Sequence, residues 1–403
     1  MVSASGELLG TAQHRTTPPE VLSGVAAVTS ALDADALPVL ACSSAGGGLR
    51  LAVVGQERLV SAEAGHRVAL SAGAKVVHVS SGPLSAAGVR SLRAASPDVL
   101  LLVGGTDGGD EKVLLHNASR LARVAVPIVL AGNAAARSAA MSLLSARQVV
   151  AVDNVLPDVG ELAPEPARGA IREVFLSHVI GGKGLSRGPR FRRLVSTVTP
   201  DAVLSAVTHL ASPDGAVLVV DVGGATTDVY SAVSMVEKSK RAVALPPNRR
   251  TVEGDLGMRV SAPGVVAESV AERLIEDAEA ESLRVAAAHR HSNVDFVPTT
   301  AEESRVDQRI AQLAVTIAIR RHLRMIDNQL GPKGAGLLVL SGGVFRHATT
   351  PITPPDDPMI RPILRTAKVV VDKESRLGPA GLLTQAGHQA TAKALLRALT
   401  GES

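Results

Sequence analysis

Residues 221–228 read Asp-Val-Gly-Gly-Ala-Thr-Thr-Asp, and this stretch decides the predicted fold. The apolar run Ala216–Val222 leads into the two glycines, and Asp228–Val233 continues as a second strand-like run. A short glycine turn between two such runs predicts a β-hairpin, not a strand followed by a loop and a helix. Because glycine has no side chain, the turn lets the backbone approach an anion closely.

The residue types around this turn predict a phosphate site for a metal-bound nucleotide. Asp221 would hold Mg²⁺ through its water ligands, and Asp228 would lie near the attacking water. The alternative is an ordinary hairpin in which the glycines only turn the chain. The glycines and hydroxyl residues that would surround the phosphates are Gly223, Gly224, Thr226 and Thr227.

Two segments further along the chain complete the predicted nucleotide site. The apolar run Leu337–Leu340 ends in Gly342 and Gly343, a glycine pair on which adenosine could lie. Between the hairpin and this run, Glu253 and Asp255 occur in a stretch that mixes acids and glycines. Carboxylates accept hydrogen bonds from vicinal hydroxyls, so these two acids are candidates for gripping the ribose; the alternative is a solvated loop.

Several motifs in order along the chain carry a resemblance to known proteins. The hairpin is similar to the second phosphate motif of the actin, sugar kinase and heat-shock chaperone superfamily. With the other motifs it resembles the MutL family associated with glutamate mutase, which shares only its name with the mismatch-repair protein. The motifs are Gly104–Gly109, Ala131–Asn133, Asp153–Pro157, Asp221–Asp228, Glu253–Arg259 and Ser341–Val344.

This resemblance implies an α/β protein with an actin-like (ribonuclease H-like) two-lobe ATPase fold that uses ATP and Mg²⁺. It further implies a reactivase or chaperone that spends ATP to remodel an adenosylcobalamin-dependent mutase and release damaged cobalamin. The mutase subunits would be its partners. The chain has no cobalamin-binding Asp-x-His-x-x-Gly motif, so we do not expect it to be the mutase itself.

The resemblance has one departure. Actin-like folds hold the nucleotide between two phosphate hairpins, and the first, Asp-x-Gly-x-Thr, does not occur before residue 98. The chain begins with what looks like the third strand of that lobe, Glu7–Ala12, so we expect a first lobe truncated at its N-terminal edge. Half of the phosphate contacts would then be absent, which leaves ATP hydrolysis open and favours a nucleotide-binding module without hydrolysis as an alternative. A small-molecule kinase of the same superfamily is the second alternative.

The segment before the hairpin predicts a parallel α/β unit. Its apolar runs are continuous, as in strands covered on both faces: Lys75–Val79, Val99–Val103, Ile128–Leu130 and Val149–Val152. Gly104–Gly109 follows the second of these runs, where it could bind a ligand, form a partner surface or serve packing alone. It lacks the dinucleotide-binding fingerprint. The predicted domains are 1–73 (partial first lobe), 74–155 (parallel unit), 156–215 (connection), 216–345 (second lobe) and 346–403 (C-terminal strand and helix).

Composition limits the other classes of function. The chain of 403 residues is 46% apolar and 20% charged with a formal charge of +4, and its basic residues form no block or stripe, so nucleic acid is not expected as a partner. No window of about 18 uninterrupted apolar residues predicts a membrane span. The single cysteine, Cys42, fits a reducing compartment, so we expect a cytoplasmic protein. The oligomeric state stays open.

Overall fold

The computed structural model describes the chain as two compact units. Unit 1 comprises Met1–Thr11, Ala202–Glu237 and Pro247–Ser403, and unit 2 comprises Ala12–Asp201 and Lys238–Pro246. The described residues are 1–15, 17, 20–43, 49–57, 60–72, 74–159, 161–174, 191, 194–211, 215–233, 247–326, 328, 330, 331, 333–348 and 356–401.

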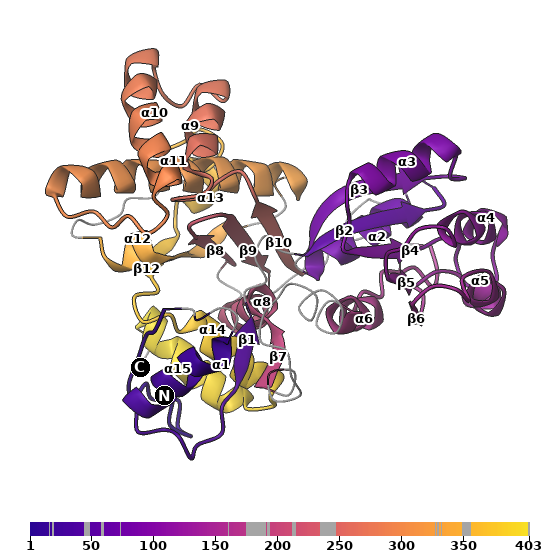
Figure 1. Cartoon of the computed structure of the whole chain (residues 1–403), viewed down its shortest axis with the longest axis horizontal. Coiled ribbons are helices and arrows are strands. Elements are labelled where there is room, and N and C mark those ends of the chain that lie inside the picture. Colours follow the sequence, from indigo (N-terminus) through magenta and orange to yellow (C-terminus); the bar gives the residue numbers. More distant parts are fainter. Residues whose placement is uncertain are drawn as a thin grey trace. The chain divides into compact units, whose positions relative to one another are not determined.

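Unit 2 is built on a five-stranded sheet in which every strand pair is parallel (Figure 1). This confirms the predicted parallel α/β arrangement. The strand order is β3-β2-β4-β5-β6. The strands are β2 (Arg50–Gly55), β3 (Lys75–Ser81), β4 (Val99–Leu102), β5 (Ile128–Leu130) and β6 (Val149–Ala151).

Helices cover both faces of this sheet. Leu51 and Val53 pack with α2 (Ser61–Ser71) and α6 (Glu165–Val174) in one core. Ala52 and Val54 face the second core, because successive side chains of a strand point to opposite faces. That core contains α3 (Ala86–Ala94), α4 (Lys112–Leu121) and α5 (Arg137–Leu143).

The predicted boundary between residues 73 and 74 is wrong. Strand β2 lies between β3 and β4, so the parallel unit begins well before residue 74. The expected strand Glu7–Ala12 is also absent: among residues 1–15 the structure has only an isolated bridge between Val2 and Leu8. Unit 2 further contains α1 (Val21–Ala31) and a two-stranded parallel sheet of β1 (Ala41–Ser43) and β7 (Val195–Val198).

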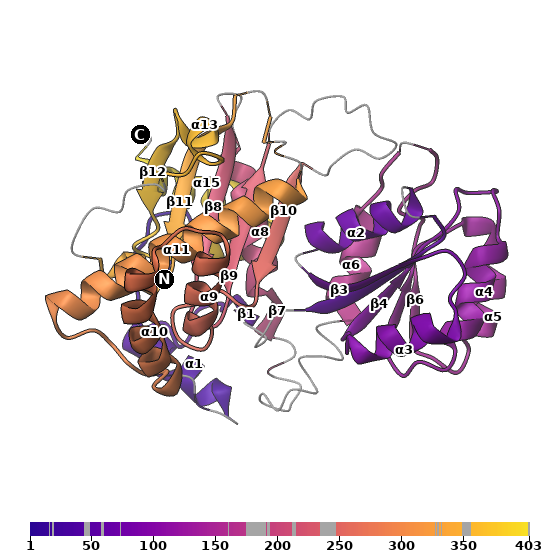
Figure 2. The same cartoon turned by 90° about the horizontal axis from the view of Figure 1, so that it is seen from above.

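Unit 1 has a mixed sheet with the order β10-β9-β8-β11-β12 (Figure 2). The first three strands pair antiparallel, whereas β8, β11 and β12 pair parallel. The predicted hairpin at residues 216–233 is therefore confirmed. The strands are β8 (Ala216–Val222), β9 (Thr227–Ala232), β10 (Asn248–Glu253), β11 (Ala335–Ser341) and β12 (Lys368–Val371).

Three helices close one face of the unit 1 sheet. Val217, Val219 and Tyr230 pack in a buried core with α8 (Thr199–Leu210), α14 (Leu377–Gln385) and α15 (Gln389–Thr400). The C-terminal segment predicted as a separate part, 346–403, thus belongs to the second lobe. In place of the single helix predicted there, the segment contains both α14 and α15, and Gly387 between them has a φ of 88°.

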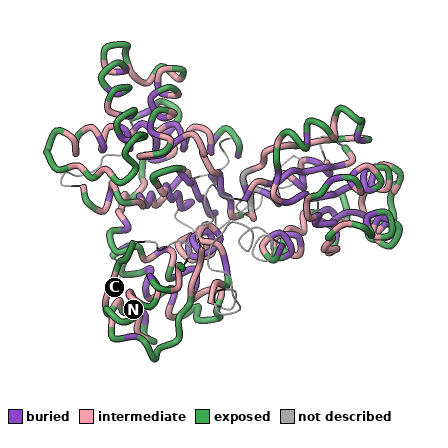
Figure 3. Tube along the Cα trace, viewed as in Figure 1, coloured by how far each residue is buried: buried purple, intermediate pink, exposed green. Residues whose placement is uncertain are grey.

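The opposite face carries the long helix α11 (Ala301–Met325) with α9 (Ala262–Ala271) and α10 (Asp277–Ser292). A capping box begins α11: the Glu303 N–H donates to the Thr300 hydroxyl (3.1 Å), and the Thr300 N–H donates to the Glu303 carboxylate (3.2 Å). Buried residues are concentrated in the inner strands of both sheets (Figure 3). Two short helices, α12 (Gly343–Arg346) and α13 (Arg361–Leu364), complete unit 1.

Among the helices of the described residues, none has the length and apolar character needed to cross a bilayer.

Candidate functional site

The two glycine motifs predicted to hold a nucleotide are neighbours in unit 1. Strand β11 pairs directly with β8, and Ser341 lies beside Asp221 in the ladder. Gly342 then adopts a φ of 120°, and a Cβ atom on it would lie 2.2 Å from the carbonyl oxygen of Val222. Only glycine permits this approach, so the absence of a side chain brings the end of β11 against the hairpin.

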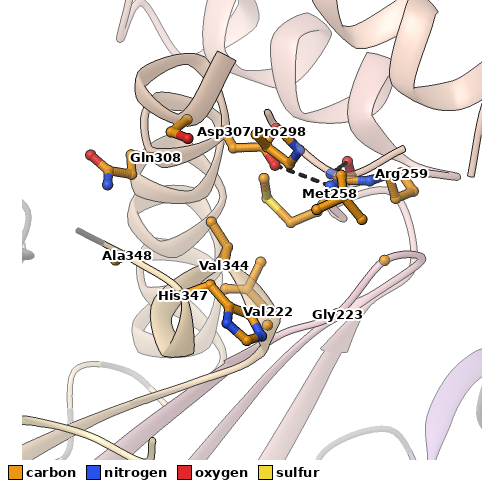
Figure 4. A pocket seen from close by; sticks show the side chains of 14 residues that line it. Val222, Gly223, Met258, Arg259, Pro298, Asp307, Gln308, Val344, His347 and Ala348 are labelled. Atoms are coloured by element: carbon orange, nitrogen blue, oxygen red, sulfur yellow. Dashed lines mark hydrogen bonds and ion pairs between the residues drawn. The ribbon is translucent and has the colours of Figure 1, made fainter. Parts of the chain in front are cut away.

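A cavity of about 350 Å³ opens where these motifs meet (Figure 4). Around it, Figure 4 shows Asp307 and Gln308 on α11 and His347 just after α12. No heavy atom lies within 4 Å of the Cβ position of Gly343, so its backbone faces open space. The lining residues are Val222, Gly223, Gly224, Met258, Arg259, Val297, Pro298, Ser304, Asp307, Gln308, Gly343, Val344, His347 and Ala348.

The loop after β10 closes on the hairpin through its backbone. The Met258 N–H donates to the Gly223 carbonyl oxygen (2.9 Å), and the Arg259 N–H donates to that of Gly224 (2.7 Å). A Cβ atom on Gly257 would lie 2.7 Å from the Ala225 carbonyl carbon, so this contact also requires glycine. The loop therefore forms one wall of the cavity with Met258 and Arg259.

Arg259 is held rigidly in that wall. Its Nη2 donates to Asp307 Oδ2 (3.0 Å), its Nε to the Phe296 carbonyl oxygen (3.0 Å) and its Nη1 to the Met258 carbonyl oxygen (2.7 Å). The guanidinium also lies over the Phe296 ring, with Cζ 5.6 Å from the ring centroid. These bonds place a fixed positive charge beside the hairpin turn.

The acids predicted to grip a ribose have another role. Arg321 Nη1 donates to Glu253 Oε2 (2.8 Å) and to both carboxylate oxygens of Asp255 (2.9 Å). Neither acid lines the cavity. The backbone of this loop reaches the hairpin, while its carboxylates pair with a cation from α11; their contact with a ribose stays a prediction.

The two threonines are also absent from the cavity lining. The Thr227 side chain is buried, and its hydroxyl donates to the Leu256 carbonyl oxygen (3.0 Å). Thr226 accepts the Gly223 N–H at its carbonyl oxygen (2.9 Å), which closes the hairpin turn. The structure therefore assigns the Thr227 hydroxyl to holding the loop and not to a phosphate.

Asp228, which was predicted to lie near an attacking water, forms an ion pair inside the sheet. It is buried, and its Oδ1 accepts hydrogen bonds from Arg250 Nε (2.9 Å) and Nη2 (2.5 Å). Alternation along β9 places Asp228 on the same face as Tyr230, and Arg250 lies over the Tyr230 ring at 5.6 Å. The cation that pairs with Asp228 comes from the neighbouring strand β10, and the contact with an attacking water stays a prediction.

Asp221 lies beside this ion pair as the cross-strand partner of Asp228. Burial and, to a smaller extent, the nearby charge of Asp228 raise the pKa of Asp221 from 3.8 to about 6, although a hydrogen bond with Ser341 acts in the opposite direction. Asp221 does not itself line the cavity, but it immediately precedes Val222, which does. Its carboxyl group is therefore a proton-sensitive acid at the edge of the site.

The structure adds lining residues that the motifs did not single out. His347 follows Gly343 by one helical turn, and this spacing could have indicated that it faces the same side. Arg259 ends the motif Glu253–Arg259, but no role was predicted for its side chain. Asp307 comes from a distant helix, and no local pattern places it beside Arg259.

Comparison with known proteins identifies the family. A family profile described as "MutL protein" matches residues 1–399. The chain belongs to the MutL protein family. It is 36% identical to the "Protein MutL" of Clostridium tetanomorphum over 341 residues, covering 77% of this chain and 74% of that protein.

The solved structures that are similar to this MutL family chain have lower sequence identity to it than the Clostridium protein has. They are the PilM–PilN type IV pilus biogenesis complex (18% identity, 56% of each chain, TM-score 0.23), nucleotide-free acetone carboxylase (13%, 92% of this chain, TM-score 0.39) and apo pSK41 ParM (10%, 72% of this chain, TM-score 0.23). This chain spans 56%, 66% and 69% of their lengths. At such TM-scores these likenesses carry no argument about fold or function.

Proposed function

We propose that the cavity of unit 1 binds ATP or ADP with Mg²⁺, in the manner expected of one lobe of an actin-like fold. The observation that carries the proposal is the single cavity shared by the hairpin glycines and by Gly343 at the end of β11. The β8–β9 turn supplies an exposed glycine backbone for phosphate, and Gly343 supplies open backbone for the nucleoside.

The residues fit such a ligand. Gly224 is exposed, and the nearest heavy atoms to its Cβ position are side-chain carbons of Arg259 at 3.8 Å, so an anion can approach the backbone beside a fixed cation. Within the described residues no group of three His, Cys, Asp or Glu side chains could hold a metal. Mg²⁺ would therefore be held mainly by phosphate oxygens and water, with Asp221 as the protein carboxylate.

When bound, Mg-ATP supplies a transferable phosphoryl group. The chain's own contributions are to orient the phosphates on the Gly223–Gly224 backbone and to place Asp221 beside them in a protonation state that changes near pH 6. Arg250 neutralises Asp228, which limits the repulsion between the two acids at the strand ends. Nucleotide binding without hydrolysis is the second candidate, because Arg250 engages Oδ1 of Asp228 through two hydrogen bonds.

We further propose that the protein assists an adenosylcobalamin-dependent mutase of the glutamate mutase type as a reactivase, with the mutase subunits as partners in the cytoplasm. Membership of the MutL family supports this, together with the motifs that the sequence shares with the family associated with glutamate mutase. In this role the nucleotide site would couple binding or hydrolysis of ATP to remodelling of the mutase.

Two neighbouring glycines test the nucleotide site. Gly343→Ala adds a methyl group that touches no protein atom, so the variant should fold normally, yet the methyl group projects into the cavity and should weaken ADP binding about tenfold. Isothermal titration calorimetry with Mg-ADP measures this. The matched control is Gly378→Ala in α14, which also adds a methyl group in open space, and it should bind ADP like the natural protein.

Unchanged ADP affinity in Gly343→Ala would contradict the assignment of the cavity. Phosphate release is then measured with and without purified mutase subunits. Stimulation by the mutase supports the reactivase, whereas tight ADP binding without release under either condition supports the second candidate.

A further inference from the structure

The sheet of unit 2 contains a topological switch point. Strands β2 and β4 are neighbours in the order β3-β2-β4-β5-β6; the chain leaves β2 through α2 on one face and leaves β4 through α4 on the other. Adjacent parallel strands whose connections leave to opposite faces form a crevice at their carboxyl ends, and ligands of open α/β sheets bind there. Here the crevice lies between Gln56, after β2, and Gly104–Thr106, after β4.

The loop after β4 is held in place by side chains from the ends of two other strands. Asn133 Oδ1 accepts the N–H of Gly108 (3.0 Å), and its Nδ2 donates to the Gly109 carbonyl oxygen (3.0 Å). Asn154 Nδ2 donates to the Gly105 carbonyl oxygen and to Asp107 Oδ1, both at 2.9 Å. Both asparagines are buried. The loop is therefore preorganised, as a binding loop needs to be.

One buried polar atom in this crevice has no protein partner. Gln56 Oε1 is shielded from solvent and accepts no hydrogen bond in the described part of the chain. It faces the glycine loop, because Cβ atoms on Gly104 and Gly105 would lie 3.4 and 3.5 Å from it. Buried acceptors are almost always satisfied, so an exception in a preorganised crevice indicates a donor supplied by a ligand.

We propose that this crevice binds a small uncharged ligand with neighbouring hydroxyl groups, of the sugar or nucleoside class. A hydroxyl can donate to Gln56 Oε1 and also accept from the N–H groups of Gly105 and Thr106, which donate to no atom of the described chain. An ammonium group could not accept those bonds.

The charges around the crevice disfavour an anionic ligand. Glu57 follows Gln56 directly and is exposed, and Asp107 and Asp110 are exposed in the glycine loop. Asp107 uses Oδ1 for the Ala134 N–H (2.8 Å) and for Asn154, so its second oxygen can accept from a ligand hydroxyl. Three carboxylates at the rim would repel a phosphate and separate this site from the nucleotide cavity of unit 1.

The test uses the full chain with methyl β-D-ribofuranoside and its 5-phosphate, followed by amide signals in NMR spectra. The uncharged glycoside should shift the signals of residues 104–107, and the phosphorylated form should bind several-fold more weakly at low salt. Gln56→Met keeps the side-chain length and removes the acceptor. It should weaken glycoside binding about tenfold and raise the melting temperature of the free protein, because the unsatisfied oxygen is gone.

Two controls keep this result separate from the nucleotide proposal. Asp221→Ala in unit 1 should leave glycoside binding intact, and Glu111→Gln, which changes a half-buried acid just outside the loop, should change it little. The proposal is overturned if the phosphorylated form binds as well as the glycoside, if neither shifts residues 104–107, or if Gln56→Met retains full affinity.

Discussion

At the scale of single residues, Asp221 links the proposed function to pH. Its folded-state pKa is raised from 3.8 to about 6, so its contribution to stability is present below pH 3.8 and is lost as the pH rises through about 6. The group is therefore strained when ionised in the free protein. A bound Mg²⁺ would relieve that strain, because a cation favours the carboxylate form.

We expect Mg-ADP to raise the melting temperature at pH 7.5 and to do so progressively less as the pH falls through 6. Asp221→Asn should be more stable than the natural protein at pH 7.5 without nucleotide and should lose most of the Mg-dependent stabilisation. Thermal shift measurements across this pH range check both effects. Equal nucleotide stabilisation in the variant would show that Asp221 does not serve the metal.

His322 has the opposite pH dependence. It is fully buried between the hydroxyls of Ser231 (2.9 Å) and Thr251 (3.0 Å), and burial, with a smaller effect from the charge of Arg249, lowers its pKa from 6.5 to about 3. The neutral ring therefore stabilises the fold above pH 6.5, and this contribution is lost as the pH falls towards 3.

In the natural protein this loss amounts to about 4 kcal/mol between pH 6.5 and 3. Chemical denaturation at a series of pH values should show a shallower acid decline in His322→Gln, which does not titrate. His347→Gln, which changes an exposed histidine, should keep the full decline. The same loss of stability at low pH in the natural protein and in both variants would contradict the role of His322.

At the scale of elements, the loop after β10 and the β8–β9 hairpin form one functional assembly. Two backbone hydrogen bonds join them, and the close approach of Gly257 to Ala225 leaves no space for a side chain. The position of Arg259 in the cavity wall depends on this contact, since its own N–H makes one of the two bonds.

Gly257→Ala should push the loop away from the hairpin. We expect a loss of about 1–3 kcal/mol in the free energy of unfolding and at least tenfold weaker binding of Mg-ADP. Urea denaturation and calorimetry measure the two quantities. Normal ADP affinity in a destabilised Gly257→Ala variant would show that the loop supports the fold but not the ligand.

At the scale of the whole molecule, the cavity lies within one of the two units. A ligand stabilises the unit that binds it, by about 2.7 kcal/mol at a hundredfold excess over Kd. Hydrogen exchange with Mg-ADP should therefore slow in peptides from 216–232, 248–271 and 335–348. Peptides from 99–151 in unit 2 should be unaffected. Protection of those peptides instead would show that the nucleotide binds unit 2 and would contradict the proposed site in unit 1.

Whether a feature could be predicted from the sequence depended on how far apart in the chain the interacting residues lie. The hairpin at Asp221–Asp228 was predictable because two strands and their turn are adjacent in the chain. The pairing of Asp228 with Arg250 was not, because a strand 22 residues away supplies the cation. The place of β2 between β3 and β4 was missed for the same reason, since strand order is set by packing across the whole sheet.

The sequence by itself determined the glycine positions, the two strand ends they serve and the family to which the chain belongs. These depend on local conformation, because only glycine adopts the backbone of Gly342 beside Val222. Tertiary structure alone decided which acids are free. Glu253, Asp255 and Asp228 all face arginines from other elements, and whether a carboxylate meets a ligand or a cation depends on contacts that the order of residues does not record.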